Sequence, residues 1–196
     1  MPSKAEILAA IRRTEVPPKE LPSLAQDWIT FPDPEKQFTE VLSLIGGRVV
    51  LANDMAAVQR DLDQHDLYVA AQQICSLVPG IARANVELNA LADPHETETI
   101  DFAVLPAQFA VAENGAVWVT DEAVKHRVLY FICQHLAFVV PRGQILNNMH
   151  EAYERLAFDR ARFGVFISGP SKTADIEQSL VIGAHGPKST TVYLVG

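Results

Sequence analysis

The residues with the clearest potential for chemistry lie in one segment near the end of the chain. Residues 168–177 read Ser-Gly-Pro-Ser-Lys-Thr-Ala-Asp-Ile-Glu and directly follow an apolar run that predicts a buried strand. Ligands of open α/β sheets gather at the carboxyl ends of strands, so this position favours a ligand-binding loop. A phosphate or a carboxylate could bind here at a helix start. The groups that would hold it are the backbone donors at Gly169, the hydroxyls of Ser171 and Thr173, and the charge of Lys172. Residue types alone favour a capped turn between a strand and a helix equally well.

The spacing in this segment excludes a nucleotide-binding P-loop. Gly164 and Gly169 are five positions apart, and a Lys-Thr pair follows them. A Walker loop needs its lysine directly after the second glycine, but Pro170 and Ser171 intervene before Lys172. The sequence also lacks a Gly-x-Gly-x-x-Gly fingerprint. We therefore do not expect an ATPase or a dinucleotide-binding protein.

Two further residues, a histidine and a glutamate, have side chains suited to acid–base chemistry. His185 lies between Gly183 and Pro187, on a predicted turn before the last strand. An imidazole that titrates near neutrality can act as an acid, a base or a donor to an anion. Glu113 adjoins Asn114-Gly115, a turn signal between two apolar runs that predicts a β-hairpin. Its carboxylate could serve as a base or a nucleophile. The structural alternatives are a loop histidine and a solvated acid.

Composition predicts a folded domain and excludes several classes of protein. The chain has 196 residues, of which 48% are hydrophobic, enough for a full core without disulfides or metals. It carries 16 Lys and Arg against 24 Asp and Glu, a net charge of −8 that argues against nucleic-acid binding. The long apolar stretch 128–141 is interrupted by Gln134 and His135, so no membrane span is expected. No secretory signal opens the chain, which predicts a cytoplasmic protein.

The sequence does not predict a metal or cofactor site within this chain. Cys75 and Cys133 are far apart, and neither belongs to a Cys-x-x-Cys pair of the kind that holds zinc or an iron–sulfur cluster. The acids and the histidine of residues 93–98 fall in a polar loop without a register that would converge them on a metal. We expect two reduced, buried thiols.

The N-terminal part, residues 1–32, is expected to form a helix and an arm. Ser3 and Glu6 have the spacing of a capping box, which predicts a short helix ending near Arg13. Five prolines, at positions 17, 18, 22, 32 and 34, then predict an extended arm that lies on the domain. The apolar residues expected to anchor this arm are Leu21, Leu24, Trp28 and Phe31.

Residues 33–196 are expected to form one α/β domain in which helices and strands alternate. Asp33-Pro34 predicts a helix start, and Asn53 is expected to cap the helix 54–62. The other predicted elements are strands over 48–52, 102–105, 135–140, 165–168 and 190–195, the hairpin over 110–119, and a helix over 145–156. The stretch 67–78 suits either a strand or a helix. This alternation predicts a layered, mostly parallel sheet with helices on both faces.

Several of these segments together resemble a known family. Residues 169–177 and the later Gly-Ala-His-Gly-Pro at 183–187 resemble the signature of the LUD, or lactate-utilisation, domain family. Residues 111–116 look like that family's Ala-Glu-Thr-Gly segment, with Asn114 in place of the threonine. The resemblance extends over about residues 102–195. It implies a fold like that of ribose-5-phosphate isomerase, glucosamine-phosphate deaminase and the CoA transferases.

The resemblance also implies which residues form the site. Loops at three strand ends would come together around an anionic ligand. The residues implied for binding are Gly169, Ser171, Lys172, Thr173 and Gly186. The residues implied for acid–base catalysis are Glu113, Asp175, Glu177 and His185.

Three functions compete at this point. The resemblance implies an accessory subunit of a bacterial system that oxidises L-lactate to pyruvate together with iron–sulfur subunits, which would carry the redox centres. The alternative is an independent isomerase or an acyl- or CoA-transferase-like enzyme that acts on a phosphorylated or CoA-linked metabolite. The third is a scaffold whose arm, residues 21–31, docks a partner or a second copy in a homodimer. A saturable ligand would favour an enzyme or a binding subunit over a scaffold.

Overall fold

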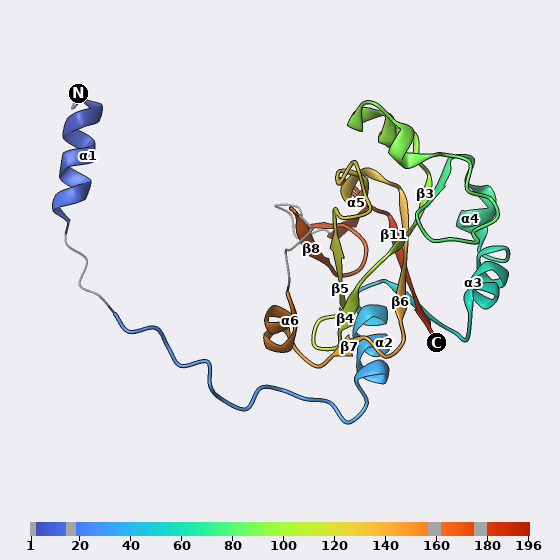
Figure 1. Ribbon diagram of the computed structural model, residues 1–196, viewed down its shortest axis with the longest axis horizontal. Helices are drawn as coiled ribbons and strands as arrows, with labels where there is room; N and C mark the ends of the chain where they lie inside the picture. Colours follow the sequence, from blue (N-terminus) through green and yellow to red (C-terminus); the bar gives the residue numbers. More distant parts are fainter. Residues whose placement is uncertain (1–2, 15–18, 157–161, 175–179) are drawn as a thin grey trace.

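The computed structural model describes residues 3–14, 19–156, 162–174 and 180–196. A layered body follows an extended N-terminal arm (Figure 1). Helix α1 (Lys4–Arg13) starts at the predicted capping box, in which Ser3 and Glu6 bond each other's backbone N–H groups. None of the helices in the described ranges is long and apolar enough to cross a membrane.

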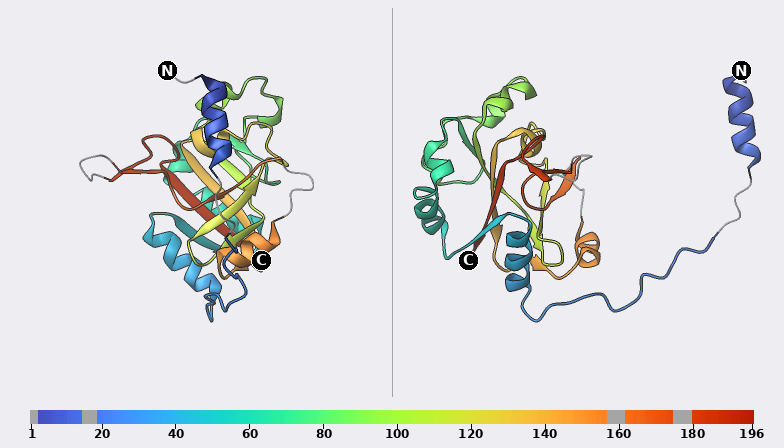
Figure 2. Two further views of the ribbon diagram at one scale, coloured as in Figure 1. Left: turned by 90° about the vertical axis from the view of Figure 1, so that its left-hand side faces the viewer. Right: turned by 180° about the vertical axis from the view of Figure 1, so that it is seen from behind.

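The arm contacts the body only at its end among the residues described. Leu21 and Leu24 are 91% and 65% exposed, so the prediction that they anchor the arm is wrong. Trp28 stacks on His150, and Phe31 packs against the main core, as predicted. Figures 1 and 2 show the blue chain after residue 19 running clear of the body before it approaches α2.

The centre of the body is a five-stranded sheet in which every neighbouring pair is parallel. Its strands, in spatial order, are β1 (Arg48–Ala52), β11 (Ser189–Val195), β6 (His135–Pro141), β3 (Phe102–Pro106) and β2 (Ile74–Ser76). Burial of both faces explains why these strands read as continuous apolar runs. The prediction of a mostly parallel layered sheet is confirmed.

One face of this sheet is covered by α3 (Met55–Leu62) and α4 (Asp66–Ala70). Val58 and Tyr68 from these helices pack with Phe102 of β3 in a core cluster. Helix α3 is capped by Asp54, whose carboxylate accepts the Ala57 N–H at 2.7 Å, and the prediction of Asn53 as the cap is wrong by one residue. Residues 67–78 resolve into the end of α4 followed by β2.

A partly buried polar network connects α3 to the sheet. The Asp61 carboxylate accepts hydrogen bonds from the Arg48 guanidinium and from the Tyr193 hydroxyl, the latter at 2.7 Å. The hydrogen bonds from Arg48 and Tyr193 lower the pKa of Asp61 against the opposing effect of its burial. The Arg48–Asp61 pair therefore stays ionised and holds α3 over β1 and β11.

The other face of the central sheet is shared by α2 (Pro34–Leu44) and a second sheet. The second sheet has four strands in the order β7 (Ile145–Leu146), β4 (Phe109–Val111), β5 (Ala116–Thr120) and β8 (Gly164–Ile167). Phe38 and Leu42 of α2 join the core between the two sheets. Figure 2 shows the resulting layers edge-on.

Helix α6 (Met149–Arg155) packs on the outer face of the second sheet, where Ala152 meets Phe109 and Trp118. The predicted helix over 145–156 is therefore too long. Ile145 and Leu146 have the spacing of a helical stripe, but they pair with β4 as strand β7. Asn148 then caps α6 through the Glu151 N–H. Tyr153, assigned to the apolar stripe, is 64% exposed.

The hairpin predicted around Asn114-Gly115 joins β4 to β5. Val111 pairs with Ala116, so residues 112–115 form its loop. Gly115 has φ +67°, a left-handed conformation that favours glycine. A Cβ at Gly115 would lie 3.1 Å from the Leu42 backbone. Glycine therefore lets the hairpin tip pack closely against α2.

The remaining described elements are short. They are the 3₁₀ helices η1 (Leu88–Ala90) and η2 (Pro94–Thr99), helix α5 (Leu129–Ile132), and the ribbon of β9 (Lys172–Ala174) and β10 (Leu180–Ile182). Element η2 replaces the polar loop predicted over 93–99, because Asp93 and Glu96 form a capping box there.

The pH dependence of stability should reflect two half-buried histidines, His65 and His135, near Phe102. The rings of His65 and His135 lie 6.0 and 6.2 Å from the Phe102 ring. Burial is the main cause that lowers both pKa values, with smaller contributions from Arg48 near His65 and from Lys188 near His135. The acids Asp61 and Asp66 near His65 and Asp101 near His135 act in the opposite direction.

We expect the free energy of unfolding to fall as the pH drops below about 6.5, because the unfolded chain then binds protons that the folded chain resists. Thermal unfolding at pH 7.5 and 5.5 measures this loss. The double variant His65→Gln, His135→Gln should lose less stability than the native chain over this interval. His95→Gln is the control, because Asp93 raises the pKa of His95. An equal loss in the native chain and the double variant would contradict the assignment.

Candidate functional site

Two loops from distant parts of the sequence meet at the candidate site. The first, Ser168–Ser171, follows β8, and the second, His185–Pro187, precedes β11. The Ser171 N–H donates to the Pro187 carbonyl at 2.8 Å, and the Gly183 N–H donates to the Ser171 carbonyl at 2.9 Å. These hydrogen bonds hold the two loops against each other.

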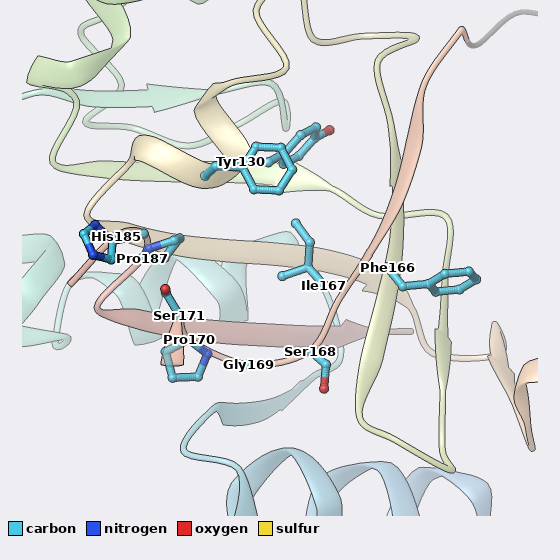
Figure 3. A pocket seen from close by; sticks show the side chains of 11 residues that line it. Tyr130, Phe166, Ile167, Ser168, Gly169, Pro170, Ser171, His185 and Pro187 are labelled. Atoms are coloured by element: carbon cyan, nitrogen blue, oxygen red, sulfur yellow. The ribbon is translucent and has the colours of Figure 1, made fainter. Parts of the chain in front are cut away.

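The loops border a cavity of about 260 Å³. Its lining comprises Tyr130, Phe131, Phe166, Ile167 and residues 168–171 and 185–187. In Figure 3 the Ser171 hydroxyl points to the side where Tyr130 and Pro187 lie, whereas the Ser168 hydroxyl points the other way. Ser168 instead donates to the Asn114 carbonyl at 2.7 Å. Ser171 and His185 are therefore the polar side chains best placed to meet a ligand.

The cavity lies at the amino-terminal edge of the parallel sheet. Pro187 precedes β11, and a Cβ on Gly46, just before β1, would lie 3.7 Å from Pro170. The expectation of a site at the carboxyl ends of parallel strands is therefore wrong. Strand β8, which leads into the loop, belongs to the second sheet and pairs antiparallel with β5. Residues 168–171 follow the carboxyl end of β8, but they lie at the amino-terminal edge of the parallel sheet.

The structure brings together four of the predicted site residues. Gly169, Ser171, His185 and Gly186 all line the cavity. Lys172 and Thr173 follow directly but form strand β9, and they are not among the lining residues. Asp175 and Glu177 lie outside the described residues.

Glu113 lies elsewhere, at the tip of the β4–β5 hairpin. Its Oε2 accepts the Met149 N–H at 2.8 Å, at the start of α6. Its own N–H donates to the Asn147 carbonyl at 3.0 Å. Glu113 is exposed and is not among the residues that line the cavity.

Two glycines shape the cavity. Gly169 has φ +70°, and a Cβ there would lie 3.2 Å from Ile45. A Cβ on Gly186 would come within 2.9 Å of the Ser171 Cβ. Any larger residue at position 186 would therefore press on the serine that faces the cavity.

Aromatic residues supply the apolar wall that sequence analysis missed. Tyr130 and Phe131 belong to α5, which lies within the apolar stretch 128–141 of the sequence. The Tyr130 hydroxyl donates to the Thr120 carbonyl at 2.9 Å, and burial raises its pKa. Tyr130 is thus a neutral wall of the cavity. Only the tertiary packing of α5 against the two loops identifies it.

The basic residues before α5 divide into two groups. Lys125 and His126 contact the Leu91 carbonyl and so fasten the segment after η1. Arg127 lies with its guanidinium carbon 5.1 Å from the Phe163 ring centre, and Phe163 meets Phe131 edge-on. Arg127 therefore places a positive charge beside an aromatic pair that reaches the cavity wall.

The described residues do not fit a metal or an iron–sulfur cluster. No group of three or more His, Cys, Asp or Glu residues with metal-binding geometry occurs among them. Cys75 and Cys133 are both buried, and burial raises the pKa of each thiol to about 12. Both side chains therefore remain protonated thiols packed in the main core.

The parallel sheet and the second sheet define a layered α/β protein in which two connecting loops border a cavity. The LUD domain family model matches residues 35–195. The chain belongs to this family, as its loop sequences predicted.

Several curated proteins are similar to this chain. Lactate utilization protein C 1 of Bacillus mycoides (strain KBAB4) is 29% identical over 102 residues, which cover 48% of this chain and 43% of that protein. Lactate utilization protein C of Geobacillus thermodenitrificans (strain NG80-2) is 25% identical over 166 residues, or 80% of this chain and 65% of that protein. The uncharacterized protein YkgG of Escherichia coli (strain K12) is 32% identical over 107 residues, which cover 51% of this chain and 46% of that protein.

The chain thus spans between 43% and 65% of the length of these relatives. Among solved structures, a DUF162 family protein from Deinococcus radiodurans matches with a TM-score of 0.57 and 18% identity. The match covers 83% of this chain and 96% of that one. At this level of identity the similarity supports the fold.

Gly186→Ala should destabilise the fold by about 1–3 kcal/mol, because the added methyl group overpacks the contact with Ser171. Chemical denaturation of the native chain and the variant measures the difference. Gly143→Ala is a matched control, because no atom lies within 4 Å of its Cβ position. Equal losses in the two variants would show that the two loops are not in contact as described.

Proposed function

We propose that this chain is an accessory, ligand-binding subunit of a bacterial lactate-utilisation system, and that its cavity binds a small hydroxy- or oxo-carboxylate. The observation that carries the proposal is the convergence of Ser171 and His185 from two separate loops on one cavity. Membership of the LUD domain family and the similarity to proteins named lactate utilization protein C support the metabolic role.

The size and lining of the cavity support a small anion. At about 260 Å³ the cavity is below the range of about 300–1,000 Å³ that drug-sized ligands occupy. It therefore suits lactate or pyruvate better than CoA or a dinucleotide. The Ser171 hydroxyl can donate to a carboxylate oxygen, and a protonated His185 would add charge. The aromatic residues add an apolar wall beside these polar groups.

Oxidation of lactate to pyruvate removes two electrons and two protons, so it requires an electron acceptor. Because Cys75 and Cys133 are buried thiols, we place the acceptor outside this chain. We propose that iron–sulfur subunits of the same system carry the clusters. The role of this chain is then to bind the acid and to present it or hold it within the assembly.

The alternative, an independent isomerase or acyl-transferase, needs an acid–base pair in the cavity. The titratable side chains among its described lining residues are His185 and Tyr130. Tyr130 is neutral and already donates its hydroxyl to a backbone carbonyl. The contacts of the described residues therefore favour a binding role.

The proposal predicts a saturable ligand. L-lactate or pyruvate at 100 times its dissociation constant should stabilise the pure protein by about 2.7 kcal/mol. For a chain of this length, that free energy corresponds to a rise of roughly 5–10 °C in the melting temperature. Thermal unfolding with L-lactate, D-lactate, pyruvate, a sugar phosphate and CoA measures the effect.

The shift should be reduced or lost in Ser171→Ala and in His185→Ala, since both remove a polar group from the cavity. Ser43→Ala and His95→Ala are matched controls at exposed positions outside the cavity and should keep the full shift. A shift with the sugar phosphate or CoA alone would instead favour the transferase or isomerase. No shift with any ligand would contradict the proposed binding role.

A further inference from the structure

Glu113 fastens the hairpin tip to the start of α6. Its carboxylate accepts the Met149 N–H at 2.8 Å, and its N–H donates to the Asn147 carbonyl at 3.0 Å. The first N–H groups of a helix have no partner within the helix, so an acid here is stabilising. Glu113 therefore acts as a second acceptor beside the cap, Asn148.

The arm is held on the same turn. The Asn147 Oδ1 accepts the Phe31 N–H at 2.9 Å, and the Asn148 Nδ2 donates to the Ile29 carbonyl at 2.8 Å. The Trp28 ring stacks on His150 with ring centres 3.2 Å apart. Two hydrogen bonds between asparagine side chains and the arm backbone and one ring stack thus attach residues 28–31 to the start of α6.

The other side of the hairpin tip contacts the cavity loop. The Asn114 carbonyl, next to Glu113, accepts the Ser168 hydroxyl at 2.7 Å. Gly115 and Gly169 both pack against Ile45, where an added Cβ would lie 3.4 and 3.2 Å from its side chain. The hairpin tip and the cavity loop are therefore in direct contact, and both also pack against Ile45 at the end of α2.

We propose that Glu113 is a positioning residue that links the attached arm to the loop bearing Ser171. Its carboxylate fixes the distance between the hairpin tip and the start of α6. The contacts of Asn114 with Ser168, and of Gly115 and Gly169 with Ile45, then hold residues 168–171 in place relative to the hairpin tip. Glu113 acts as a hydrogen-bond acceptor in this role and needs no proton transfer. The inference rests on the proposed function only for the identity of the ligand that the loop receives.

Hydrogen exchange of the full chain without ligand tests the link. In Glu113→Ala, the amides of Met149 and of residues 165–171 should exchange about fivefold faster or more, because one stabilising contact is lost. Glu113→Gln keeps a side-chain carbonyl that can accept the Met149 N–H, so it should restore slow exchange. Asp54→Ala is the matched control, because it removes the cap of α3 on the opposite face of the central sheet.

A variant in the arm tests the same link from its other end. Trp28→Ala should accelerate exchange of the Phe31 and Met149 amides, whereas Leu21→Ala, at an exposed position, should not. The proposal is overturned if Glu113→Ala leaves residues 165–171 unchanged. It is also overturned if Glu113→Gln behaves like Glu113→Ala, or if Asp54→Ala produces the same change.

Lactate or pyruvate binding then separates the two proposals. If the native chain binds the ligand, Glu113→Ala should weaken binding and Glu113→Gln should retain it. A catalytic carboxylate would be lost in both variants, so loss of lactate oxidation by the assembled system in Glu113→Gln, with lactate binding intact, would overturn the positioning role. If the native chain binds neither acid, the proposed function fails while the exchange experiment still decides the role of Glu113.

Discussion

The parallel pairing of β6 between β11 and β3 is the constraint on which the rest of the structure depends. Successive residues of β6 face opposite cores, with Leu136 and Phe138 in one and Ala137 in the other. A strand buried on both faces must be covered on both, and parallel neighbours require crossover connections. The helices α3 and α4 cover one face, and α2 with the second sheet covers the other.

The position of the cavity follows from this arrangement. The crossover into β11 must return the chain to the amino-terminal edge of the sheet before the strand can begin. The chain therefore passes residues 183–187 just before Ser189, beside the loop that leaves β8. Because the two loops are held by packed strands and by mutual backbone hydrogen bonds, Ser171 and His185 line the same cavity.

The same constraint explains why one acid of the motif lies apart from the cavity. Glu113 is at the tip of the hairpin formed by β4 and β5, and these strands pack between the central sheet and α6. The tip contacts the start of α6 and the Ser168 hydroxyl of the cavity loop, and the Glu113 carboxylate accepts the Met149 N–H. The segments that carry the family resemblance therefore contain residues that line the cavity together with a residue whose contacts hold the neighbouring segments in place.

Elements whose signals are local could be predicted from the amino-acid sequence alone. Strand β1 lies at the predicted residues 48–52, and helix α2 starts at the predicted Asp33-Pro34, because caps and short apolar runs depend on neighbouring residues. The loop motifs also identified the family and four residues that line the cavity. Only the tertiary structure decided the rest. Ile145 and Leu146 became a strand because β4 is available to pair with them, and the cavity lies at the amino-terminal edge because β8 joined the second sheet. Both outcomes depend on contacts between residues far apart in the chain, which local spacing does not encode.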